Sequence, residues 1–182
     1  MKKIFLIAGL MAAFLLVVVS ASAQKTANFA GTWALDKTKS QGLSPRMQGA
    51  DSVTWTITQD DKTISIDQKI TGGQPPAGGG GMGGGGGRGP GGPMAYNLDG
   101  NEANSDVTFG QATGKLTTKA TWSGGTLDLV RKTSFTAQDG SERTNTNTQK
   151  LSLSGDGKTL TAVVHSEGRA GPTDSTLVFN KQ

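Results

Sequence analysis

The feature that most constrains the fold is an alternation of apolar and polar residues with a period of two. It is plainest over residues 52–58, where threonines alternate with Val53, Trp55 and Ile57. Successive side chains of a β-strand point to opposite faces of the sheet, so this pattern predicts a strand with one buried face. A turn at residues 60–62 leads into a second alternating run, and the two runs predict a hairpin.

The same alternation recurs along most of the chain and predicts about nine strands. They fall near residues 29–35, 52–58, 64–70, 94–98, 116–122, 127–135, 143–153, 160–164 and 177–179. Turn dipeptides such as Asp99-Gly100 and Asp156-Gly157 separate several of them. A short helix fits the irregular connection between Leu35 and Ser52. Sequential strands joined by tight turns favour one all-β domain, a single antiparallel up-and-down β-barrel, because closure removes exposed strand edges.

The N-terminus has a different composition, which predicts a signal peptide over residues 1–23. Lys2 and Lys3 precede an apolar run, and Ala21-Ser22-Ala23 matches the small-residue cleavage pattern. The run is short for a spanning helix, which needs about 20 residues. We expect cleavage after Ala23, which leaves a domain of residues 24–182 in the periplasm or secreted and no membrane span. An uncleaved anchor is the alternative.

Composition excludes several kinds of chemistry and partner. The chain has no cysteine, so disulfides, thiolate catalysis and cysteine-ligated metals are absent. Removing two lysines from a formal charge of +4 leaves +2 on the mature chain. This charge is scattered, whereas nucleic-acid binding needs a clustered basic face. We expect no metal, no cofactor and no nucleic-acid partner.

A glycine-rich run at residues 72–93 interrupts the strand pattern. No Lys-Ser or Lys-Thr follows its glycines, as a phosphate-binding P-loop requires, and the chain continues as a strand where a dinucleotide site needs a helix. Arg88 is its only cation, too few for an RNA-binding arginine–glycine segment. The run is predicted to be a disordered loop between two strands of one barrel, with a flap over the barrel mouth as a further hypothesis.

The single histidine, His165, offers little support for catalysis. It follows Val164 on a predicted strand, and since Val164 belongs to the inward set, His165 is expected to face solvent. No Gly-x-Ser-x-Gly nucleophile elbow is present. The carboxylate pair Asp60-Asp61 lies on a turn, where acidic residues are usually solvated and not catalytic. We expect no enzymatic activity, with a hydrolase as the minority alternative.

Polar residues occur at positions that the alternation turns inward, and they are the candidate site. If Leu127 and Leu129 face the core, Arg131 and Thr133 face it too. The same argument, applied to neighbouring strands, turns Arg143, Asn145 and Gln68 inward. A buried unpaired cation is costly, so these groups need partners, water or a ligand. The alternative is that the strands run past the barrel or carry a bulge, which would leave these groups in solvent.

The segment NFAGTWALDKTKS, with Gly31 and Trp33, resembles the first-strand signature of lipocalin-like (calycin) barrels. Residues 151–161, 96–100 and 120–129 resemble small, mostly uncharacterised secreted bacterial proteins. The resemblance implies a barrel with a cavity for a small, largely apolar ligand. It also implies that Trp33 is a structural plug at the closed end, covered by a cation of the last strand, a place that Lys181 would take.

Together these observations predict an exported barrel that binds a small molecule, with an apolar body and an acidic head group that Arg131 and Arg143 could hold. The alternative is a non-enzymatic structural or interaction protein of the cell envelope whose barrel is filled by its own side chains. The state of the lumen distinguishes these two functions. An open, polar-lined cavity favours small-molecule binding, and a lumen filled by aromatic side chains favours the structural or interaction role.

Overall fold

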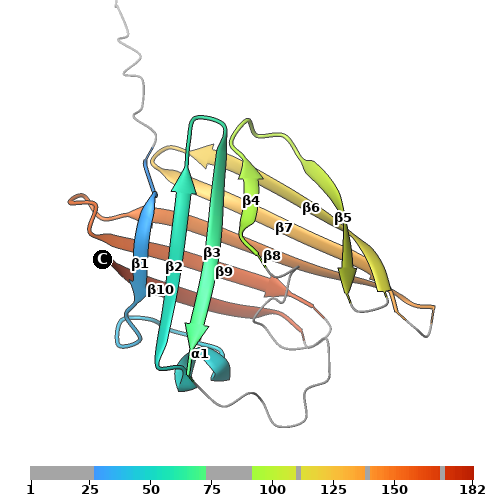
Figure 1. Ribbon diagram of the computed structural model, residues 1–182, viewed down its shortest axis with the longest axis horizontal. Helices are drawn as coiled ribbons and strands as arrows, with labels where there is room; N and C mark the ends of the chain where they lie inside the picture. Colours follow the sequence, from blue (N-terminus) through green and yellow to red (C-terminus); the bar gives the residue numbers. More distant parts are fainter. Residues whose placement is uncertain (1–26, 73–91, 110–111, 138–139, 169–170) are drawn as a thin grey trace, which may run out of the picture.

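The computed structural model describes residues 27–72, 92–109, 112–137, 140–168 and 171–182 (Figure 1). The predicted signal peptide and residues 73–91 of the glycine-rich run lie outside them. The elements are β1 (Gly31–Leu35), α1 (Pro45–Gly49), β2 (Ser52–Gln59), β3 (Thr63–Thr71), β4 (Met94–Asn97), β5 (Ala103–Phe109), β6 (Ala112–Ser123), β7 (Thr126–Thr136), β8 (Glu142–Leu153), β9 (Thr159–Glu167) and β10 (Thr173–Lys181).

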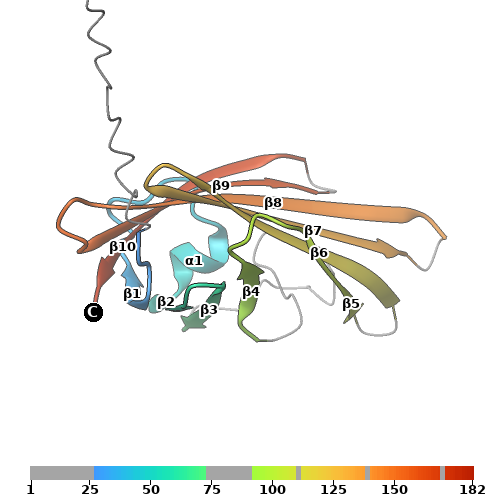
Figure 2. The ribbon, with the colours of Figure 1, turned by 90° about the horizontal axis from the view of Figure 1, so that it is seen from above.

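All ten strands form one antiparallel sheet in the order β4-β3-β2-β1-β10-β9-β8-β7-β6-β5. Pairing of β1 with β10 joins the two ends of the chain, and the long strands β6 to β9 arch over β1 to β4 (Figure 2). The predicted fold class, an all-β antiparallel up-and-down barrel, is confirmed. The barrel is nearly closed: β4 and β5 are the two ends of the strand order and do not pair with each other.

The strand count is ten where the alternation predicted about nine. The strand that was not predicted is β5, Ala103–Phe109. Pairing with β6 puts Ala103, Ser105, Val107 and Phe109 in one phase. Only the last two are large and apolar, so the hydrophobic alternation of this strand is confined to its end.

Aromatic side chains fill one part of the interior. Phe29, Trp33 and Phe179 are fully buried, and Trp55 is nearly so. The rings of Trp55 and Phe179 lie 4.4 Å apart, and Phe29 stacks on Trp122 at 6.0 Å between ring centroids. Burial of one such side chain contributes roughly 1.5–3 kcal/mol, so this aromatic cluster contributes substantially to stability.

Gly31, Trp33 and Lys181 lie together where β1 pairs with β10. The Trp33 indole nitrogen donates a hydrogen bond to the Phe29 carbonyl at 2.9 Å, and the Lys181 ammonium lies 5.3 Å from the Trp33 ring centroid. Gly31 has φ of +143°, and a Cβ atom there would lie 3.1 Å from Lys181 Cε. Glycine is therefore favoured by the backbone angle, and a side chain here would also displace the lysine stem slightly.

The predicted short helix between β1 and β2 is also confirmed. Ser44 caps α1, Pro45 occupies its first turn, and Met47 is buried under the barrel. Among the described residues, no helix is long and apolar enough to cross a membrane.

Candidate functional site

The inner face of the sheet changes from apolar to polar along strands β7, β8 and β9. Cross-strand pairing sets the rows, because paired residues lie side by side on one face. The first row is Leu127, Leu151 and Ala162, and the next is Leu129, Gln149 and Val164. The row beyond these is Arg131, Asn147 and Ser166. On these three strands, polar side chains therefore follow directly after the buried leucines on the inner face.

Arg131 is the charged residue of this inner polar region. It is half-buried, and it pairs across to Thr118, which is only 6% exposed. Among the described residues, no aspartate or glutamate lies within ion-pair distance of its guanidinium. A half-buried cation without a counter-ion favours the approach of an anion.

Tyr96 on β4 lies near enough to Arg131 to be affected by its charge. The Tyr96 side chain is 3% exposed. Burial raises the pKa of its hydroxyl, while the nearby positive charge of Arg131 acts in the opposite sense. The hydroxyl is therefore a neutral hydrogen-bond donor at ordinary pH. We call Tyr96, Thr118, Arg131, Asn147 and Gln149 the Arg131 site.

Amide side chains complete the Arg131 site. Asn147 donates to the Ser166 hydroxyl at 2.7 Å, and Gln149 donates to the Asn147 carbonyl oxygen at 2.9 Å. Gln149 Oε1 is buried and has no hydrogen-bond partner in the described chain. An orphaned buried acceptor is uncommon in folded proteins, and a donor group on a ligand or a water would satisfy it.

The predicted site residues are divided by the structure. Thr133 is half-buried one row beyond Arg131, opposite the exposed Asn145. Arg143 is half-buried at the far end of β8, where the long strands extend past the shorter ones (Figure 1). Gln68 is exposed, because β4 pairs with β3 only over Thr63–Ile66 and leaves Gln68 uncovered. Only Arg131 and Thr133 lie together in the half-buried interior.

Tyr96 and Thr118 were missed as site residues. Tyr96 is the single tyrosine of the chain and alternates with Met94, a pattern that predicts an inward position. Its closeness to Arg131, however, depends on how β4 folds back across the barrel, and no local pattern carries that information. Thr118 lies on the predicted inward face of its strand. Threonine is so common in this chain that its presence there does not indicate a binding site.

A pocket of about 300 Å³ lies where β4 and β5 separate. We call it the seam pocket. Its lining comes from both strands and from β6 behind them: Pro93, Met94, Ala95, Asn97, Ala103, Asn104, Ser105, Leu116 and Thr118. Thr118 belongs to both the seam pocket and the Arg131 site, so the two adjoin.

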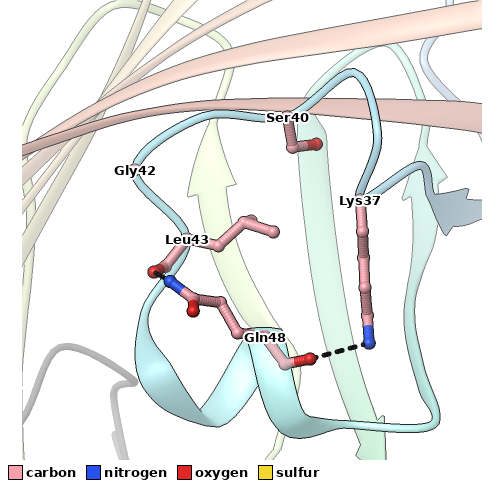
Figure 3. A pocket seen from close by; sticks show the side chains of 5 residues that line it. All are labelled: Lys37, Ser40, Gly42, Leu43 and Gln48. Atoms are coloured by element: carbon pink, nitrogen blue, oxygen red, sulfur yellow. Dashed lines mark hydrogen bonds between the residues drawn. The ribbon is translucent and has the colours of Figure 1, made fainter.

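A second pocket of about 340 Å³ lies in the loop around α1 (Figure 3). Lys37 extends along one side of it and donates to the backbone carbonyls of Gln48 and Ala50. Gln48 in turn donates to the Leu43 carbonyl at 2.6 Å. The cation of this pocket is thus already engaged at the C-terminal end of α1, which favours a structural role.

His165 lies on the outer face, as predicted. Its Nδ1 is 2.7 Å from Asp174 Oδ1, and its Nε2 is 3.3 Å from Glu167 Oε1. Hydrogen bonds to these two carboxylates raise the pKa of the imidazole, and Asp174 has the larger effect. In the described chain no hydroxyl group hydrogen bonds to the ring, so a serine-type catalytic arrangement is not formed.

Three comparisons with known proteins were made. No protein-family model matches the chain, and no curated protein sequence matches it. Among solved structures, it is similar to the zebrafish ileal bile acid-binding protein complexed with cholic acid. The alignment has 14% sequence identity, covers 85% of this chain and 98% of that one, and has a TM-score of 0.45.

Proposed function

We propose that this protein is an exported barrel that binds a small amphipathic molecule with an acidic head group. The observation that carries the proposal is Arg131, a half-buried cation on the inner wall with no acidic partner among the described residues. The proposal includes no catalytic step, metal or cofactor.

The chemistry of the Arg131 site selects the head group. A guanidinium matches a carboxylate or phosphate in a planar, two-pronged arrangement, and such charge-assisted bonds are about twice as strong as neutral ones. The hydroxyls of Tyr96 and Thr118 are further donors for an anion. Gln149 Oε1 accepts rather than donates, so a hydroxyl on the ligand would satisfy it.

The surroundings select an apolar body for the ligand. Met94 and Leu116 line the seam pocket beside the Arg131 site, and the leucine rows adjoin its other side. Pockets for small molecules typically combine apolar walls with a few convergent polar groups, which is the composition found here. A fatty or terpenoid acid therefore fits better than a sugar or a nucleotide.

Export is the second part of the proposal, and the sequence supports it. The two lysines, the apolar run and the Ala21-Ser22-Ala23 pattern are typical of a signal peptide cleaved after Ala23. Together with the resemblance of the C-terminal strands, they support the proposal of a small secreted or periplasmic protein. Sequencing the N-terminus of the protein recovered from its own cell envelope tests the cleavage.

Binding is tested with a fluorescent long-chain fatty acid and its methyl ester. Arg131→Met should weaken binding of the acid by roughly 10–100-fold, since one hydrogen bond to a charged group contributes about 1.5–3 kcal/mol. Binding of the ester should change little. Lys132→Met is the matched control, because Lys132 is the exposed next residue on the outer face. Equal affinities of the acid for both variants would refute the role of Arg131.

A filled barrel with an envelope interaction role is the second candidate, and the aromatic cluster favours it. Phe29, Trp33 and Phe179 are fully buried and occupy much of the interior. Native mass spectrometry of protein purified from its own envelope separates the two functions. A co-purified small molecule supports the binding function, whereas repeated recovery of the bare chain, together with no binding of the fatty-acid probe, supports the filled barrel.

A further inference from the structure

The seam pocket touches both faces of the barrel wall. On β4, pairing with β3 puts Met94 beside Ile66 and Tyr96 beside Ile64 on the inner face, so Ala95 and Asn97 lie on the outer face. The pocket is lined by Met94 as well as by Ala95 and Asn97. Since neighbouring residues of a strand face opposite sides, a pocket lined by both sets lies along the unpaired edge of β4, where the inner and outer faces of the wall meet.

The β5 side of the seam shows the same arrangement. Ser105 pairs with Leu116 and belongs to the inner face, while Asn104 between the inward positions belongs to the outer face. Both line the pocket. Ser105 is exposed although it faces inward, because β5 has no partner on this side. The inner wall is therefore open to solvent here.

The inner end of the seam pocket adjoins the Arg131 site. Leu116 and Thr118 of β6 form the pocket's inner lining and are 9% and 6% exposed. Thr118 is the cross-strand neighbour of Arg131. The Arg131 site is thus one side chain away from an opening in the wall, while the aromatic cluster fills another part of the interior.

We propose that the seam between β4 and β5 is the route by which an acidic amphiphile reaches and leaves the Arg131 site. This inference rests on the proposed function, since it concerns access to the same site. No backbone hydrogen bonds join β4 to β5, so widening the seam breaks none. Entry through any other part of the described wall would require separation of paired strands. The side chains at the seam are small or apolar, which suits passage of an aliphatic chain.

The test exploits the absence of cysteine from the chain. Ala95→Cys places one thiol on the outer lip of the seam, where a bulky maleimide would obstruct it. Thr58→Cys is the matched control. Thr58 and Ala95 are both exposed and both pair with Ser65, so they flank it on the same outer face. Each variant is compared with its own unlabelled form, which removes any effect of the substitution on folding.

The readout is stopped-flow association and dissociation of the fluorescent fatty acid. Labelled Ala95→Cys should show both rates reduced roughly tenfold or more with little change in Kd, because an obstructed route slows entry and exit alike. Labelled Thr58→Cys should bind at the unlabelled rate. Bound fatty acid should also slow the labelling of Ala95→Cys but not that of Thr58→Cys.

Three results would overturn the inference, and they are distinguishable. Unchanged rates after labelling of Ala95→Cys would place the route elsewhere. Weaker affinity with an unchanged association rate would show that the seam is part of the binding site and not the route of entry. Absence of fatty-acid binding by the unmodified protein would refute the proposed function itself, and the route with it.

Discussion

The aromatic cluster and the Arg131 site are two parts of one interior that differ in charge. Around Trp33 the side chains are apolar and almost fully buried; the Trp33 indole nitrogen donates to the Phe29 carbonyl, and the Trp55 indole nitrogen is buried without a hydrogen-bond partner. Around Arg131, a half-buried cation lacks a counter-ion among the described residues, and its neighbours are polar, including Gln149 with its orphaned acceptor. The difference indicates that the first part contributes stability through apolar burial, while the second holds a charge suited to an acidic ligand.

The largest expected effect comes from emptying the aromatic cluster. Trp33→Ala should lower the free energy of unfolding by about 3–5 kcal/mol, because it leaves a cavity in a closed core. Thr133→Ala, in the polar region, should cost less than about 1 kcal/mol. Urea denaturation followed by circular dichroism measures both. Similar losses at the two positions would remove the distinction between the two parts of the interior.

The closed end should also depend on glycine at position 31. Gly31→Ala should cost on the order of 1–3 kcal/mol, because a side chain at φ of +143° is strained and its Cβ would press on Lys181. Gly155→Ala is the control, since a Cβ there meets nothing within 4 Å. Thermal unfolding of both variants measures the difference. A Gly31→Ala variant as stable as Gly155→Ala would show that the closed end tolerates a side chain.

Much of this division could be predicted from the sequence, because alternation fixes which residues face inward. Arg131 and Thr133 follow Leu127 and Leu129 in phase, and the register bears that phase out. Alternation does not fix how far each strand is covered. Gln68 faces inward in phase yet is exposed, because β4 is short and pairs with β3 only over Thr63–Ile66, a length that the alternation does not determine.

The seam could not be predicted for a related reason. The strand β5 has large apolar residues only at Val107 and Phe109, so it was not expected, and a barrel with an unpaired edge cannot be inferred from a count of strands. The proximity of Tyr96 to Arg131 is likewise a product of topology. Both are contacts between segments that only the closed sheet brings together.

A smaller effect is expected at the orphaned acceptor of the Arg131 site. Gln149→Met removes a buried unsatisfied oxygen but also the hydrogen bond to Asn147. The two changes oppose each other, so the free energy of unfolding should stay within about 1 kcal/mol of the parent. Urea denaturation provides the measurement. A loss of several kcal/mol would show that this polar region is a structural core like the aromatic cluster.

The smallest effect is expected outside the barrel, at His165. Asp174 and Glu167 raise the pKa of the folded imidazole above its ordinary value. The protonated ring therefore stabilises the fold below about pH 6.5, and this contribution is lost as the pH rises through the folded pKa. His165→Gln should remove that part of the pH dependence of Tm and leave fatty-acid affinity unchanged. A change in affinity would connect the outer face to the interior.

The central claim is that the polar part of the interior holds an acidic head group at Arg131. The most direct measurement is carbon NMR of palmitate labelled at its carboxyl carbon, titrated with acid while bound. Pairing with the guanidinium should keep the pKa of the bound carboxyl below that of the same acid bound to Arg131→Met, because removing the cation removes its stabilisation of the carboxylate. Identical titration curves in the two proteins, or no bound resonance in the parent, would contradict the claim.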